Sequence, residues 1–333
     1  MNHRLVILIS LLVSVSCEDR LWFSTPKEEK VLNVNGLLDT SDSLHTLRVA
    51  YATSEEALPA EDVSVLCHVN GREVPVDAGE RKGDFLFRSE LRPSDRVSLR
   101  VVSPGTEAFT ESVVPRQPEI GTVQVTRNGE VFVCRIEVRD IPEEDSFYRL
   151  DIRGRQRAYG RQSGLEYKEE RTLAVDPSGD PVLGKSRVSD RYSYQHLEYD
   201  GVIFSDEAFR DGRISFTVRV GLNQLDEPCF WYSLEGSPVD YHGVSSLVVK
   251  LSSIPREDYE LTEYFRFHWD DLYDNLGFLS YFEEEGVYPN NVENAIGNVF
   301  VRSSVSQAVD ILEMDYTSDD PGHPSITWKV PSE

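Results

Sequence analysis

The stretch VSVLCHVNGREVPV, residues 63–76, places two runs of alternating apolar residues on either side of Asn70-Gly71. An Asn-Gly pair between such runs is the strongest short signal for a β-hairpin, because both turn positions need a positive φ. The alternation puts every second side chain on one face of each strand. This stretch therefore predicts two paired antiparallel strands, each with one buried face.

The same alternation recurs on both sides of the hairpin, in segments that begin near residues 31, 44, 84, 96 and 108. Short strands separated by regular turn signals are typical of an immunoglobulin-like (Ig-like) β-sandwich. The tryptophan and disulfide of antibody domains are missing, which favours a fibronectin-like or transthyretin-like variant. Pro115 and Pro118 bracket a boundary, so we expect this sandwich to occupy residues 30–117.

A second β-rich domain is expected over residues 118–333, and the whole fold class is therefore mainly β. It contains another Asn-Gly pair, Asn128-Gly129, between alternating runs, which again indicates a hairpin. Its one strong helical pattern lies at about 256–275, where apolar residues recur every three or four positions. We expect this amphipathic helix to pack its apolar stripe against an antiparallel sheet.

The N-terminal segment LVILISLLVSVSC, residues 5–17, follows a short basic tip. Its apolar run of about 11 residues is too short to span a membrane, which takes about 20, but it suits a secretory signal peptide. The end of the run resembles a bacterial lipobox, which predicts a signal peptide over residues 1–16, cleavage between Ser16 and Cys17, and lipidation of Cys17. An ordinary signal peptide with an unmodified cysteine remains the alternative.

The residues behind Cys17 form an expected tether, residues 17–29, that begins with Glu18 and Asp19. Acidic residues at this place resemble the surface-export signal of Bacteroidota lipoproteins, although a solvated tether would also be acidic. We therefore expect attachment to the outer membrane through acyl chains on Cys17, with the cell surface favoured over the periplasmic face. Several acyl chains bind a bilayer stably, whereas one is marginal.

The composition constrains the partners and the chemistry of the 333-residue chain. Its formal net charge of −24 repels nucleic acid, so none is expected as a partner. Cys67 and Cys134 lie in apolar runs, where cysteine is usually a small buried hydrophobe. The cysteines and histidines show no metal-binding spacing, and we expect neither a metal site nor a cofactor.

Catalytic motifs are missing as well: the sequence contains no G-x-S-x-G elbow, no phosphate-binding P-loop and no H-E-x-x-H. We therefore predict no catalytic residue, although a carboxylate pair formed in space would escape a search along the chain. The candidate contacts for a ligand or cation are Asp315, Asp319 and Asp320, together with Glu293 and Asn294. For these residues, a solvated turn or local capping is the competing interpretation.

Four segments resemble a known family. They are VLNVNGLLD (31–39), LRPSDRVSLRVVSPGTEAFTESVVP (91–115), FSDEAFRDGRISFTVRV (204–220) and NVENAIGNVF (291–300). In this order, they are similar to the Bacteroidota outer-membrane lipoproteins of domain-of-unknown-function family 4249. Ala295 differs from the glycine that is frequent in that family.

The resemblance implies a lipid-anchored accessory or binding protein that serves a TonB-dependent receptor, a β-barrel transporter of the outer membrane. The family has no established catalytic residues, so the resemblance supplies none. Two other functions remain open: a structural or adhesive envelope protein, and a hydrolase with an unrecognised carboxylate site.

Overall fold

The structure is a computed structural model, in which a defined set of residues can be described. These are residues 31–52, 57–139, 146–160, 166–177, 179–183, 201–209, 211–225, 241–263, 290–316 and 325–327. For residues 314–316 and 325–327, the backbone alone is described.

Strands dominate the described part of the chain, which confirms the mainly β fold class. In the first half they are β1 (Val31–Asp39), β2 (Leu44–Ala52), β3 (Ala57–Pro59), β4 (Ser64–Val69), β5 (Arg72–Val74), β6 (Val76–Ala78), β7 (Asp84–Arg88), β8 (Arg96–Ser103), β9 (Thr106–Val113), β10 (Glu119–Asn128) and β11 (Val131–Arg139). In the second half they are β12 (Phe147–Gly160), β13 (Glu166–Thr172), β14 (Val202–Ser205), β15 (Arg213–Gly221), β16 (Tyr241–Ile254), β17 (Val299–Tyr316) and β18 (Ser325–Thr327). Short 3-10 helices follow β14 and β15, at Asp206–Ala208 and Leu222–Gln224.

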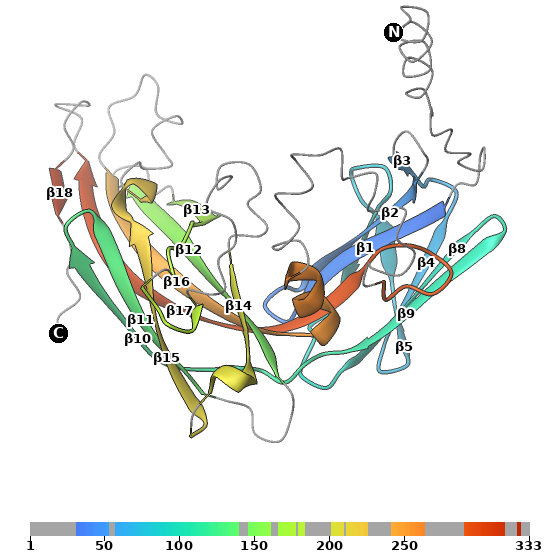
Figure 1. The fold of residues 1–333 in the computed structure, drawn as a ribbon. Coiled ribbons are helices and arrows are strands. Elements are labelled where there is room, and N and C mark those ends of the chain that lie inside the picture. Colours follow the sequence, from blue (N-terminus) through green and yellow to red (C-terminus); the bar gives the residue numbers. More distant parts are fainter. Residues whose placement is uncertain are drawn as a thin grey trace, which may run out of the picture.

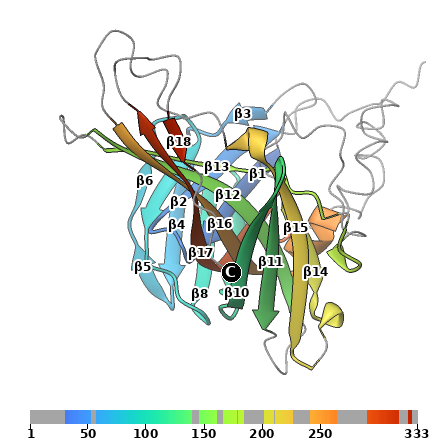
Figure 2. The ribbon, with the colours of Figure 1, turned by 90° about the vertical axis from the view of Figure 1, so that its left-hand side faces the viewer.

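These strands build one large sheet and two small ones. The large sheet has the order β13-β12-β16-β17-β1-β2-β7-β6, and the small sheets have the orders β5-β4-β8-β9 and β10-β11-β15. Each small sheet covers one half of the large sheet, so that the two sandwiches form the arms of a wide U (Figure 1). Figure 2 looks onto the second arm, with β10, β11 and β15 in front of the long strands.

Each sandwich has its own hydrophobic core. The first core includes Leu47 and Val49 of β2 and Leu99 of β8, and the second includes Leu150 of β12 and Phe216 of β15. In β2, β8 and β15, buried residues alternate with more exposed ones, as the period of two in the sequence predicts.

The long strand β17 links the two sandwiches. Its first residues pair with β1 in parallel, with Val299 opposite Gly36, and nearly all of the strand pairs with β16 in antiparallel. Figure 1 shows β17 running from one arm to the other. The described pairs of strands within residues 118–333 are antiparallel, as expected, and the parallel pair joins this part of the chain to β1. β1 and β17 are far apart in the sequence, so no hairpin turn joins them and forces them to run antiparallel.

The hairpin at Asn70-Gly71 is confirmed, with φ of 53° and 75° at the two turn residues. The second predicted hairpin is also present, but its turn is displaced by one residue. Asn128 remains the last residue of β10 and pairs with Val131, which leaves Gly129, at φ 61°, and Glu130 to form the turn.

The predicted helix begins at Arg256, and residues 256–263 of it are described; the remainder, to residue 275, lies outside the described residues. The ring of Tyr259 lies 4.9 Å from that of Phe147, and the guanidinium of Arg256 lies 5.0 Å above the same ring. In the described part of the chain, no helix has the length and apolar character needed to cross a membrane.

The turn that precedes β17 fastens the start of this strand to the first sandwich. The backbone of Glu293 exchanges hydrogen bonds with Phe109, and the side chain of Asn291 bonds both N–H and C=O of Val299. Gly297 has φ 118°, and a Cβ there would lie 2.2 Å from the carbonyl oxygen of Val34. The turn therefore needs glycine at this position for both conformation and space.

Candidate functional site: the concave face of the large sheet

Strand β12 has a different character on each of its two faces. Tyr148, Leu150 and Ile152 belong to the second core, so the odd-numbered residues between them point to the opposite side. That side carries Arg149, Asp151, Arg153, Arg155 and Arg157, which face away from β10, β11 and β15 toward the inside of the U. We call the inner surface of the large sheet the concave face.

Cross-strand register extends the concave face over the neighbouring strands. Asp151 lies opposite Lys250 of β16, and Arg155 lies opposite Glu170 of β13. From β16 the register continues to β17, where Ser252 lies opposite Ser304. The polar side chains of four adjacent strands therefore share one surface, and they fall into two groups.

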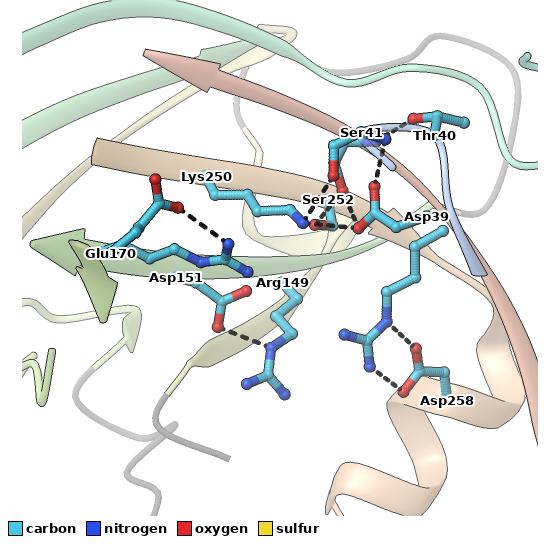
Figure 3. A network of polar contacts seen from close by, with 12 residues as sticks. Asp39, Thr40, Ser41, Arg149, Asp151, Glu170, Lys250, Ser252 and Asp258 are labelled. Atoms are coloured by element: carbon cyan, nitrogen blue, oxygen red, sulfur yellow. Dashed lines mark hydrogen bonds and ion pairs between the residues drawn. The ribbon is translucent and has the colours of Figure 1, made fainter. Parts of the chain in front are cut away.

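The first group lies where the two sandwiches meet, and we call it the junction network (Figure 3). Its centre is Asp39, at the end of β1, whose carboxylate accepts hydrogen bonds from Lys250 at 2.8 Å and Ser304 at 2.8 Å. The ammonium of Lys250 also donates to Ser41 at 3.1 Å, and Ser252 and Ser304 bond each other at 2.7 Å. Strands from both sandwiches thus hold one buried charge pair.

Burial alone would raise the pKa of the Asp39 carboxyl. The positive charge and hydrogen bond of Lys250 outweigh this effect, with further hydrogen bonds from the Ser41 backbone and the Ser304 hydroxyl, and they hold the pKa below its ordinary value. Asp39 is therefore a stable anion at neutral pH.

Two more charge pairs complete the junction network. The helix contributes Asp258, whose carboxylate receives two hydrogen bonds from Arg302 of β17, at 2.6 and 2.9 Å. On β12, Arg149 bonds Asp151 at 2.9 Å, and Gly201 packs so closely on this pair that a Cβ would lie 2.2 Å from the Asp151 carboxylate. The network consists of Asp39, Ser41, Arg149, Asp151, Lys250, Ser252, Asp258, Arg302 and Ser304.

The charges of the junction network balance, with three cations and three carboxylates, and the side chains of all six are nearly buried. Buried ions require close partners, because losing water costs each ion several kcal/mol. A balanced and enclosed set of this kind fixes the positions of the strands and leaves little capacity for a ligand.

The second group is the arginine row, which consists of Arg153, Arg155 and Arg157 of β12. Their side chains are 35%, 37% and 36% exposed, so solvent reaches them. Arg153 and Arg155 both bond the single carboxylate of Glu170, at 3.1 and 2.8 Å. The carboxylate of Asp310 lies 3.9 Å from Arg157, which is beyond hydrogen-bond distance.

The electrostatics of Glu170 reflect this crowding of cations. Partial burial would raise the pKa of this carboxyl, but the hydrogen bonds and charges of Arg155 and Arg153 hold it below the ordinary value. Glu170 therefore remains ionised and neutralises one of the two arginines that share it. The row places three cationic side chains next to one another on a chain whose formal net charge is −24.

Of the residues predicted to contact a ligand or cation, two are described together with their side chains. Glu293 and Asn294 lie in the turn before β17, where Asn294, at φ 58°, donates a side-chain hydrogen bond to the carbonyl of Glu107. Asp315 belongs to β17, and its side chain is not described. Asp319, Asp320, Ser16 and Cys17 lie outside the described residues.

Among the side chains that are described, no group of three or more histidines, cysteines or acids is arranged to hold a metal ion. Cys67 and Cys134 are both buried and free, as predicted, and burial raises the pKa of each thiol to about 12. Both thiols are therefore unreactive at neutral pH, because the thiolate is the nucleophile.

Sequence reasoning missed the concave face. The signal was present in RLDIRGRQR, residues 149–157, where charged residues alternate with uncharged ones. That pattern indicates a strand with one apolar and one basic face. By contrast, no local pattern reveals that Asp39 and Lys250, which are 211 positions apart, form a pair.

Comparisons with known proteins agree with the resemblance noted in the sequence. No curated protein matches the chain. One solved structure is described as the complete structure of manganese lipoxygenase of Gaeumannomyces graminis and partial structure of zonadhesin of Komagataella pastoris. It shares 9% identity, with 87% of this chain and 97% of that chain covered, and its TM-score of 0.20 supports no statement about fold or function.

The model of one protein family matches residues 18–308, which is most of the chain. By this match, the protein belongs to the family described as Domain of unknown function (DUF4249).

Proposed function

We propose that this protein is a lipid-anchored accessory protein of the outer membrane that binds a partner through its concave face and performs no catalysis. The observation that carries the proposal is the contrast within this face. A closed, charge-balanced junction network holds the sheet in place, and beside it an arginine row presents accessible cationic groups. Rigid presentation of accessible charged groups suits recognition of a partner.

The proposed anchor is a diacylated and N-acylated Cys17, reached after removal of residues 1–16. The lipobox-like end of the apolar run supports this part of the proposal. The first described strand begins at Val31, so the tether of residues 17–29 is short. A short tether keeps the binding face near a membrane partner and raises its effective concentration there.

The proposed partner is a TonB-dependent receptor, and the proposed location is the cell surface. The resemblance to Bacteroidota lipoproteins supports both, as do Glu18 and Asp19 directly behind the cysteine. The partner's ligand is left open.

We also propose that the first sandwich is Ig-like. The support is its strand order, in which β1-β2-β7-β6 face β5-β4-β8-β9. In chain order, these positions correspond to strands A, B, E and D opposite C, F and G of an Ig-like domain, with β5 added beside C.

The experiment is purification of the full chain from native membranes with an affinity tag, followed by mass spectrometry. We expect the mature chain in the outer-membrane fraction, together with a large β-barrel protein. A Cys17→Ala variant should appear in the soluble periplasmic fraction without that partner. A wild-type chain that carries no lipid, or that purifies alone from the membrane, would contradict the proposal.

A structural role in the envelope is the second candidate, because three buried charge pairs at the junction favour a stiff connection between the arms. Deletion of the gene distinguishes the two candidates. Loss of transport with an intact envelope supports the accessory role, whereas a leaky envelope with normal transport supports the structural one.

A further inference from the structure

Within the described part of the chain, the arginine row forms fewer hydrogen bonds than its donors could make. Each guanidinium carries five N–H groups in a planar fork, which suits one carboxylate bound through two parallel hydrogen bonds. Arg153 and Arg155 instead share Glu170 through one hydrogen bond each. Asp310 accepts a 2.6 Å hydrogen bond from Ser246, on the same oxygen that lies 3.9 Å from Arg157.

Two of these donors are both buried and unsatisfied. Among the described residues, the Nε atoms of Arg153 and Arg157 are buried and have no hydrogen-bond partner. The remainder of each side chain reaches solvent, since about a third of it is exposed. The exposed part of each side chain is where an acceptor of a partner can bind, and a carboxylate there forms a charge-assisted hydrogen bond.

The spacing of the row indicates the form of the ligand. Side chains on one face of a strand repeat every second residue, which places successive arginines about 6.8 Å apart. An extended peptide presents its own side chains with the same period. Carboxylates at alternate positions of such a peptide can therefore each meet one guanidinium, with the two chains in register.

We propose that the arginine row binds an extended acidic segment of a protein partner, with Asp or Glu at alternate positions. This assignment rests on the proposed accessory function and names the element of the partner that the concave face recognises. The rest of the chain, with its net charge of −24, repels such a segment, so binding is confined to the row. Salt screens charges beyond about 8 Å and acts less on contacts at the row itself.

The test uses a fluorescein-labelled peptide of six Glu-Thr repeats and the full mature chain without its lipid, with binding followed by fluorescence anisotropy. We expect saturable binding of this peptide and none of a peptide of six Lys-Thr repeats. A peptide of three Glu-Glu-Thr-Thr repeats, which has the same composition, should bind several-fold more weakly, because every second side chain on each of its faces is threonine.

The variants that decide the proposal act in opposite directions. Arg155→Gln and Arg157→Gln should each weaken binding about tenfold, the loss expected for one charge-assisted contact. Glu170→Gln should strengthen binding several-fold, because it releases two guanidinium groups from an internal carboxylate. Arg100→Gln is the matched control, since this arginine of β8 pairs with Glu107 on the first sandwich and should leave binding unchanged.

Circular dichroism establishes that each variant is folded before its affinity is compared. The proposal is overturned if the alternating peptide does not bind, or if the Arg100 variant loses as much affinity as the others. Tight binding of an oligogalacturonate with no binding of the peptide would assign the row to an acidic glycan instead. If the Arg155→Gln and Arg157→Gln variants still co-purify with the β-barrel, the accessory function stands, but the arginine row is not its binding surface.

Discussion

The ammonium group of Lys250 lies 2.8 Å from a carboxylate oxygen of Asp39, although the two residues are 211 positions apart. Lys250 belongs to the long strand that builds the second sandwich, and Asp39 ends the first strand of the first sandwich. The contact therefore joins the two arms of the U inside a shared sheet. This contact helps to hold together the two halves of the large sheet, so that their inner surfaces form one continuous concave face.

We first predict that Asp39→Ala destabilises the protein by about 3–5 kcal/mol, because it leaves the charge of Lys250 buried without a partner. The free energy of unfolding in urea measures the effect. The control is Glu61→Ala, which removes the partner of Lys82 in an exposed pair and should cost less than about 1 kcal/mol. Equal losses of unfolding free energy in the two variants would show that the buried pair of Asp39 and Lys250 stabilises the protein no more than an exposed pair does.

A second prediction concerns acid. The pKa of Asp39 is lowered in the folded chain, so its pair contributes stability that is fully present above the ordinary value of 3.8. That contribution disappears as the pH falls through the lowered folded pKa. The free energy of unfolding, followed from about pH 5 downward, should therefore fall more steeply in the wild-type protein than in an Asp39→Asn variant. Parallel curves for the two proteins would contradict the assigned ion pair.

Thirdly, Gly297→Ala should destabilise the protein far more than Gly212→Ala. Both glycines have positive φ, of 118° and 71°, but space surrounds Gly212 while the new Cβ at Gly297 would meet the Val34 carbonyl oxygen. Melting temperatures of the two variants make the comparison directly. A small and equal decrease in both would mean that the turn before β17 rearranges freely.

The fourth prediction concerns the first sandwich in isolation. The turn before β17 and the start of that strand contribute Val292, Ala295, Val299 and Val301 to the first core. A fragment of residues 18–117 lacks all four, and also lacks the strand that pairs with the free edge of β1. We expect this fragment to lack a cooperative thermal transition, and we expect the addition of a peptide of residues 290–304 to restore part of one. A cooperative transition in the fragment alone would show that the first core is complete without the later residues.

The sequence predicted the local elements of this fold well. Alternation located the strands of the first sandwich, and Asn70-Gly71 predicted its hairpin, because both signals depend on neighbours in the chain. The parallel pairing of β1 with β17 was not predictable in this way, since only the folded sheet brings those segments together.

The candidate site also has one part that the sequence predicts and one part that it does not. The alternating basic residues Arg153, Arg155 and Arg157 can be recognised in the sequence, and this pattern predicts a strand with one basic face. The role of Asp258 was hidden. A carboxylate near the start of a helix usually interacts with the helix dipole in solvent, whereas the structure buries Asp258 against Arg302.

The most direct test of the account is photo-crosslinking in living cells with a photoreactive amino acid placed at one position at a time. Position 157 lies on the concave face, and position 66, an exposed leucine of β4, lies on the other side of the first sandwich. We predict that the residue at position 157 crosslinks to a large outer-membrane β-barrel protein and that the residue at position 66 does not. The same crosslink from both positions, or no crosslink from position 157 while the protein stays in the membrane, would contradict the assignment of the concave face as the binding surface.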